Sequence, residues 1–167
     1  TEVCILDFDV RDKTAVFKAV ASLTEPFQNI DILINNAGNA HGLDSIHKGD
    51  PQDWDAMIDG NVKGLMYVTK ALLPMMIKSK KGHIINLGSI AGKEVYPNGN
   101  VYCASKHAVD ALTNGMRMDL NPFGIKVMGI HPGLVETEFS LVRFKGNSQR
   151  AETVYKGYAP LVAQDIA

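Results

Sequence analysis

Short apolar runs alternate with segments of helical spacing along this chain, and that alternation constrains the fold more than any other feature. The β-rich runs are Val3 to Phe8, Ile30 to Ile34, His83 to Leu87 and Lys126 to Ile130. Between them, apolar residues recur every three or four positions in Lys13 to Leu23, Gln52 to Ile77 and Tyr102 to Leu120. Strands that are joined by long helical crossovers pair in parallel. The sequence therefore predicts an α/β fold, a doubly wound parallel sheet with helices on both faces.

Proline and acidic residues indicate where several helices begin and end. Asp50 followed by Pro51 is the expected order of cap and first helical residue for the second helix. Pro74 is expected to bend or interrupt the far end of that helix, because proline removes a hydrogen-bond donor. The third helix is predicted to end before Pro122. Near the end of the chain, Asp165 lies in the first turn of a predicted helix.

Composition favours one globular domain over residues 1–167, since the chain has 167 residues and is 46% hydrophobic. A formal net charge of −1 gives no general attraction to nucleic acid or to an anionic membrane, so neither partner is predicted. The apolar stretches fall far short of the roughly 20 residues of a transmembrane helix.

Two cysteines without a CxxC motif favour a reducing compartment, and we expect the cytoplasm. The five histidines show no ligand spacing, so no metal is predicted.

Each predicted strand ends in polar or glycine-containing residues. These exits are Asp9, Asn35 to Gly38, Gly88-Ser89 and Pro132-Gly133. In doubly wound sheets, ligands bind beyond the carboxyl ends of the strands. Any one exit is also compatible with an ordinary turn, but together they predict a binding site at this edge.

Three residues at this edge suit proton transfer coupled to hydride transfer at a carbinol or carbonyl carbon. Tyr102 and Lys106 are four residues apart, which places them on one face of a helix. That spacing alone is common on solvated helix faces, but Ser89 ends the preceding strand and converges on the same edge. A nearby ammonium favours the phenolate form of a tyrosine, and a serine hydroxyl can hold the substrate oxygen. Ser89 lies outside a G-x-S-x-G motif, which argues against a hydrolase.

These motifs resemble the short-chain dehydrogenase/reductase family. The resemblance is carried by Asn35-Asn36-Ala37-Gly38, Asn61, Ser89, Tyr102-Cys103-Ala104-Ser105-Lys106, and Pro132-Gly133 followed by Thr137. It covers essentially the whole chain and implies an oxidoreductase with a Rossmann-like NAD(P)-binding domain. The domain is expected to be partial here, because the family's Gly-rich first βαβ unit and its last helix and strand have no counterpart in these residues.

The resemblance also implies a role for each matching residue. The implied catalytic residues are Asn61, Ser89, Tyr102 and Lys106, with Tyr102 as acid/base, Ser89 orienting the substrate and Lys106 lowering the pKa of the tyrosine. The implied cofactor-binding residues are Asp9, Val10, Asn36, Ala37, Gly38, Tyr102, Lys106, Pro132, Gly133, Val135 and Thr137.

The stretch from Gly133 to Gly146 resembles one group within the family, the NADP-dependent 3-hydroxy acid dehydrogenases, and its fungal members most of all. This group includes enzymes that act on serine and allo-threonine, and it implies NADP as cofactor and a homotetramer. NAD is the alternative cofactor, because the segment that discriminates between the two follows a strand outside this sequence. Arg143 is the candidate clamp for a substrate carboxylate, and Lys145 is a second candidate. The alternative is that both are solvated loop charges.

Two other hypotheses stay open at this point. A family member could act as a carbonyl or dicarbonyl reductase on a different substrate. Alternatively, the chain could be a truncated, non-catalytic remnant that keeps the motif residues and uses its helical faces for oligomer contact.

Overall fold

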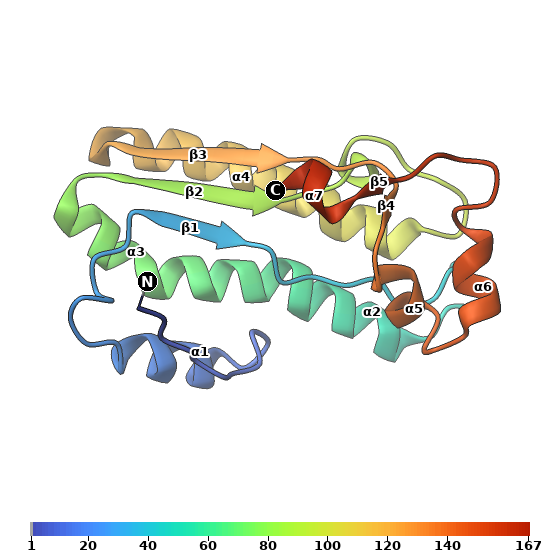
Figure 1. The fold of residues 1–167 in the computed structure, drawn as a ribbon, viewed down its shortest axis with the longest axis horizontal. Coiled ribbons are helices and arrows are strands. Elements are labelled where there is room, and N and C mark those ends of the chain that lie inside the picture. Colours follow the sequence, from blue (N-terminus) through green and yellow to red (C-terminus); the bar gives the residue numbers. More distant parts are fainter. Residues whose placement is uncertain (1) are drawn as a thin grey trace.

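A parallel sheet forms the centre of the computed structural model, which describes residues 2–167 (Figure 1). Its strands are β1 (Ile32–Asn35), β2 (Gly82–Leu87) and β3 (Ile125–Ile130), hydrogen-bonded in that order. Both pairings are parallel, and Ile84 lies between Leu33 on one side and Val127 on the other. The three carboxyl ends therefore meet at one edge, and the predicted α/β fold class is confirmed.

The predicted helices are present with small shifts of their ends. They are α1 (Lys13–Ala21), α2 (Pro51–Ile58) continuing into α3 (Leu65–Ser79), and α4 (Asn100–Leu120). Asp50 caps α2 as predicted, because its side chain accepts a hydrogen bond from the Gln52 amide at 2.9 Å. A short 3₁₀ turn, η3 (Asn121–Phe123), contains Pro122, so α4 ends before that proline as expected.

A π-helical turn, η1 (Asp59–Gly64), joins α2 to α3 in the middle of the helix predicted for Gln52 to Ile77. Pro74 does not interrupt the helix, since α3 continues through that residue to Ser79. A proline removes one backbone donor, and α3 continues past it while its neighbours Leu73 and Met76 pack into the core.

The strand predicted for Val3 to Phe8 is absent from the described residues, where this stretch forms no ladder. Strands need a neighbour to accept their backbone hydrogen bonds, and none of the described strands pairs with this stretch. Its side chains are accordingly open to solvent, with Val3 76% and Ile5 86% exposed.

The main core lies between the sheet and the helices α3 and α4. Its buried members are Leu33, Met76, Ile84, Leu120, Ile125 and Val127. Because side chains alternate along a strand, Ile32 and Ile34 point to the opposite face, where both are exposed. The helices α3 and α4 thus fix the face that carries the core, and α4 runs along β3 from the carboxyl edge back to the amino end of the sheet (Figure 1).

The last fifth of the described chain lies around the carboxyl ends of the strands (Figure 1). It contains β4 (Val135–Glu136), α5 (Phe139–Arg143), α6 (Ser148–Thr153), β5 (Leu161–Val162) and α7 (Ala163–Ile166). β4 and β5 pair in parallel as a separate small sheet. Asp165 lies in the first turn of α7, as predicted, and accepts a hydrogen bond from the Val162 amide at 2.8 Å. None of the helices formed by residues 2–167 has the length and apolarity that crossing a bilayer requires.

Candidate active site

Tyr102 and Ser89 come from different elements and meet at the carboxyl edge of the sheet. Ser89 follows β2 in extended backbone and begins the 3₁₀ turn η2 (Ile90–Gly92), where its hydroxyl accepts a hydrogen bond from the Ala91 amide at 3.1 Å. Tyr102 lies in the first turns of α4 and is buried. Burial raises the pKa of Tyr102 above its ordinary value, and the neighbouring Ser89 hydroxyl opposes that rise. The predicted neighbourhood of the two hydroxyls is therefore present.

Lys106 lies one turn after Tyr102 on α4 and is buried, with its Nζ donating to the Leu87 carbonyl at 2.9 Å. Desolvation lowers the pKa of Lys106 to about 8. Its Nζ is 6.0 Å from the centre of the Tyr102 ring. The charge of Arg143 lowers the pKa of Tyr102 here, and the implied role of Lys106 in lowering that pKa stays a prediction.

Asn61 lies in the π-helical turn η1 and connects three segments. Its Oδ1 accepts from the Asn39 amide at 2.8 Å, and its Nδ2 donates to the Asn39 carbonyl at 2.8 Å and to Ser105 Oγ at 3.0 Å. Ser105 in turn donates to the Tyr102 carbonyl at 2.7 Å. Asn61 thus ties the segment after β1 to the helix turn that carries Tyr102 and Lys106.

A buried polar chain behind this site was missed by the sequence analysis. Asn35 donates to Thr69 Oγ1 and to Asn86 Oδ1, each at 2.9 Å. Asn86 donates to Thr113 Oγ1, also at 2.9 Å. The signal was available, because Asn35 and Asn86 occupy inward positions of otherwise apolar strands, where an amide needs buried partners.

Arg143, the candidate for a substrate carboxylate, is buried. Its Nε donates to the Gly42 carbonyl at 2.8 Å and its Nη1 to the Tyr96 hydroxyl at 3.1 Å. The guanidinium carbon is 5.6 Å from the centre of the Tyr102 ring. No carboxylate of residues 2–167 forms an ion pair with Arg143. The predicted alternative of a solvated loop charge does not describe this residue.

Lys145, the second candidate, lies outside this arrangement. It is exposed and forms an ion pair with Asp53 at 2.9 Å. That carboxylate raises the pKa of Lys145.

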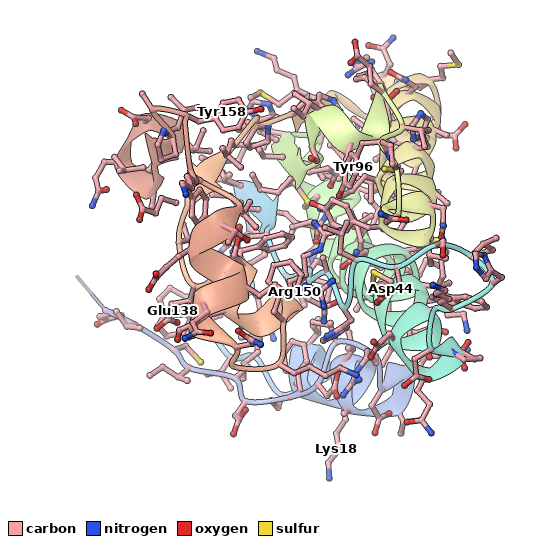
Figure 2. All side chains as sticks on the ribbon, turned by 90° about the vertical axis from the view of Figure 1, so that its right-hand side faces the viewer. Lys18, Asp44, Tyr96, Glu138, Arg150 and Tyr158 are labelled. Carbon is pink, nitrogen blue, oxygen red and sulfur yellow. The ribbon has the colours of Figure 1, made fainter. Side chains whose placement is uncertain are left out.

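Sequence reasoning also missed Tyr96, whose ring packs near Tyr102 in a second buried cluster. Figure 2 looks onto this edge and shows Tyr96 beside α4, with Arg150 and Asp44 facing one another below it.

The pocket beside Tyr102 and Arg143 has an empty volume of about 300 Å³ including its open mouth. Its other walls include Trp54 and Met57 from α2 and the segment from His41 to Asp44. Within the described part of the chain, no group of three or more His, Cys, Asp or Glu side chains is arranged to hold a metal ion.

The segment Asn36-Ala37-Gly38 follows β1 and is exposed at the same edge. A Cβ atom on Gly38 would lie 3.1 Å from Asn61 Oδ1 and 3.6 Å from Lys106 Nζ. Glycine thus leaves room directly in front of the Lys106 ammonium, whose other donors can reach a ligand hydroxyl. These features fit the approach of a dinucleotide ribose, so the residues present suit the cofactor that the sequence implied.

Asp9 and Val10, the residues expected at the adenine, lie at the start of the described chain. The Asp9 carboxylate pairs with Arg11 through contacts of 2.6 to 3.0 Å, and the hydrogen bonds from Arg11 lower its pKa. Val10 packs over Gly64 at the end of η1, where a Cβ atom would lie 2.8 Å from Val10 Cγ2. This stretch therefore lies beside η1, the turn that carries Asn61.

The loop after β3 holds the remaining expected cofactor residues. The Pro132 carbonyl accepts from the Ile90 amide at 3.0 Å, which ties this loop to the turn after Ser89. Val135 lies in β4, and the Thr137 hydroxyl accepts from the Phe139 amide at 3.2 Å. Gly133 is exposed. The structure thus places all four residues, Pro132, Gly133, Val135 and Thr137, on the segment that leads from the sheet edge to α5.

A parallel sheet with polar residues gathered at its carboxyl edge has the arrangement of a doubly wound, dinucleotide-binding fold. Comparison with known proteins identifies the family: the short chain dehydrogenase model matches residues 1–147, and the chain belongs to that family. The chain is 46% identical over 164 residues to the NADP-dependent 3-hydroxy acid dehydrogenase of Escherichia coli, covering 98% of this chain and 66% of that protein. It is 45% identical to the enzyme of the same name from Schizosaccharomyces pombe, covering 97% and 62% respectively.

A solved structure extends the similarity to three dimensions. The closed form of a serine dehydrogenase complexed with NADP⁺ matches with a TM-score of 0.92 and 47% identity. The match covers 95% of this chain and 64% of that one. Bacterial and fungal relatives match to nearly the same extent, and the chain spans just under two thirds of the length of these relatives.

Proposed function

We propose that the protein is an oxidoreductase that transfers a hydride between NADP(H) and the carbinol or carbonyl carbon of a small 3-hydroxy acid, such as serine or allo-threonine. The observation that best supports this proposal is the buried guanidinium of Arg143, whose carbon lies 5.6 Å from the centre of the Tyr102 ring. A buried cation without an acidic partner is costly, and a substrate carboxylate would supply that partner. The similar proteins, which are 3-hydroxy acid dehydrogenases and a serine dehydrogenase, support the same class of substrate.

Tyr102 is the proposed acid and base. Because burial raises its pKa, Tyr102 carries its proton at neutral pH and can donate it to a carbonyl oxygen during reduction. In the oxidative direction the same hydroxyl must lose its proton, and the neighbouring Ser89 hydroxyl and the charge of Arg143 favour that step. Ser89 holds the substrate oxygen within reach of Tyr102.

NADP, when bound, supplies the hydride donor or acceptor of this reaction. Lys106 and Gly38 would hold its nicotinamide ribose, and the loop from Pro132 to Thr137 would lie against its nicotinamide end. Asp9 and Val10 would lie at the adenine. Asn61 keeps Asn39 and Ser105 in place and so positions both walls of this groove.

The decisive experiment replaces Arg143 by alanine in the natural protein. Loss of charge-assisted hydrogen bonds worth about 1.5–3 kcal/mol predicts a Michaelis constant for a hydroxy acid raised about 10- to 100-fold. The Michaelis constant for a neutral secondary alcohol should change little. Arg143→Lys, which keeps the charge without the planar fork, should recover part of the loss. Equal effects on the acid and the alcohol would rule out the carboxylate clamp.

We further propose a homotetramer in the cytoplasm. The free thiols of Cys4 and Cys103 suit a reducing compartment, and the relatives are enzymes of a family in which oligomers are common. The outer surfaces of α3 and α4 would form the subunit contacts. Light scattering of the natural protein measures this mass directly, and a monomer would contradict the proposal.

A further inference from the structure

His131 occupies a space that two glycines leave open at the sheet edge. A Cβ atom on Gly88 would lie 2.5 Å from His131 Nδ1, and one on Gly129 would lie 2.9 Å from His131 Nε2. Real Cβ atoms do not approach that closely. The imidazole therefore lies directly on the backbone of β3 and of the segment that leads from β2 to Ser89.

Both ring nitrogens of His131 face hydrogen-bond acceptors. Nδ1 is 3.3 Å from the carbonyl oxygen of Ser89, and Nε2 is 3.3 Å from Asp110 Oδ1. In its imidazolium form the ring can donate to both, whereas a neutral ring can donate to only one. Behind Asp110 lies Lys93, whose Nζ contacts the carboxylate at 2.7 Å. The hydrogen bond from Lys93 lowers the pKa of Asp110, with the charges of His131 and His107 adding to the effect.

Asp110 belongs to the same helix as the proposed acid and base. It follows Tyr102 by eight residues and Lys106 by four, so it extends their face of α4 by one turn. His131 directly follows β3 and precedes the loop that begins with Pro132. The pair thus links α4, which carries Tyr102, to the backbone of Ser89.

We propose that Asp110 and His131 are positioning residues that hold the Ser89 hydroxyl in place beside Tyr102. The inference rests on the proposed function for its catalytic consequence. Its structural content is independent, because it predicts that the placement of the Ser89 hydroxyl beside Tyr102 depends on His131.

The test compares three variants of the natural protein. His131→Leu removes both ring contacts, and His131→Asn retains an amide donor near the position of Nδ1. His83→Leu is the matched control, since it alters a histidine of the same sheet at the amino end of β2. We expect His131→Leu to lower kcat about 10-fold with the Michaelis constant changed less than 3-fold. His131→Asn should retain at least a third of kcat, and His83→Leu should match the unsubstituted protein.

A second readout does not require activity. Carbon-13 NMR of labelled tyrosine follows the titration of Tyr102, and Ser89→Ala serves as the benchmark. Because the neighbouring Ser89 hydroxyl lowers the pKa of Tyr102, both Ser89→Ala and His131→Leu should raise it. A merely structural His131 would leave this pKa unchanged in the folded variant.

The two readouts separate the outcomes. An unsubstituted protein that oxidises no hydroxy acid with NADP overturns the proposed function, and the tyrosine titration then still decides the role of His131. If His131→Leu leaves the pKa of Tyr102 where it is, the positioning role is overturned. Equal losses of kcat in His131→Leu and His131→Asn, accompanied by equal losses of stability, also overturn it.

Discussion

The two ends of the same sheet are built from the same strands and helices but bury different mixtures of side chains. At the amino end, Leu33, Ile84 and Val127 pack with Met76 and Leu120 in an apolar core. Toward the carboxyl end, a smaller apolar cluster around Tyr102 and Cys103 lies beside many buried polar side chains, among them Asn35, Asn61, Thr69, Asn86, Ser105, Lys106, Thr113 and Arg143. Apolar burial favours folding at the first end, whereas polar burial at the second end costs desolvation that hydrogen bonds must offset.

This difference teaches that α4 serves two purposes along one axis. Its last turns contribute Leu120 and Met116 to the core, and its first turns contribute Tyr102 and Lys106 to the site. Substitutions at one end should therefore change stability, and substitutions at the other should change activity. Four variants test that division.

Tyr102→Phe is expected to have the largest effect. Removal of a general acid and base costs about 10²–10⁴-fold in rate, and we expect about 10³-fold in kcat. The free energy of unfolding should change by less than 1 kcal/mol, because the ring stays in its buried place. Steady-state kinetics with a hydroxy acid and denaturant unfolding measure the two quantities. Retention of more than a tenth of kcat would show that the acid and base is another group.

Ile84→Ala reports on the opposite end. This side chain is fully buried between β1 and β3, so its truncation should destabilise the protein by about 3 kcal/mol. The turnover number per folded molecule should stay within twofold of the unsubstituted value, because the cavity lies in the apolar core. Urea unfolding with active-site titration checks this. A large loss of turnover in the folded fraction would break the division between the two ends.

Lys106→Met should raise the stability of the protein while it removes the activity. Because the pKa of Lys106 falls from 10.5 unfolded to about 8 folded, its charged form disfavours folding at pH 7. That shift is worth about 3 kcal/mol, and the lost bond to Leu87 subtracts about 1 kcal/mol. We therefore expect a stability gain of about 2 kcal/mol together with loss of activity.

The pH dependence of that gain is also defined. Between pH 8 and pH 10.5 the unfolded chain binds more protons at Lys106 than the folded protein does, so the unsubstituted protein gains stability as pH rises. The advantage of Lys106→Met should shrink across this window. Unfolding measured at pH 7, 9 and 10 tests it, and a variant less stable than the unsubstituted protein at pH 7 would contradict the assigned desolvation.

Lys145→Ala is expected to have the smallest effect. The Lys145 side chain of its ion pair with Asp53 is solvent-exposed, and such pairs contribute little to stability. Stability should stay close to that of the unsubstituted protein, and kcat and the Michaelis constant should stay within twofold. Since Lys145 lies two residues from Arg143, this variant is also the matched control for Arg143→Ala. If Lys145→Ala raised the Michaelis constant for hydroxy acids as much as Arg143→Ala does, the assignment of the carboxylate clamp to Arg143 would be wrong.

The sequence predicted the parts of the fold that depend on local pattern. The apolar runs around Leu33, Ile84 and Val127 indicated the strands, because buried parallel strands are almost continuously apolar. The run at Val3 to Phe8 has the same character and forms no strand, since strand formation depends on a neighbour that pattern cannot show. Pro74 does not interrupt α3, which continues through that residue to Ser79.

The site was predictable where it depends on motif and unpredictable where it depends on distant contacts. Ser89, Tyr102 and Lys106 lie at the predicted edge. The burial of Arg143 arises from Gly42 and Tyr96, which are 101 and 47 residues away in sequence. The balance of charges on Tyr102 likewise depends on Arg143, which no spacing within α4 could reveal.

The π-helical turn η1 sets the rotational phase between two stretches of one continuous helix. Each added residue turns an α-helix by about 100°, so the residues before and after 59–64 keep their facings only for one length of this tract. α2 presents Trp54 and Met57 to the pocket, while α3 presents Met76 to the core. A substitution within 59–64 keeps the length of this turn and therefore the facing of both helices. An insertion or deletion there would turn the pocket wall away from Tyr102 while leaving the core intact.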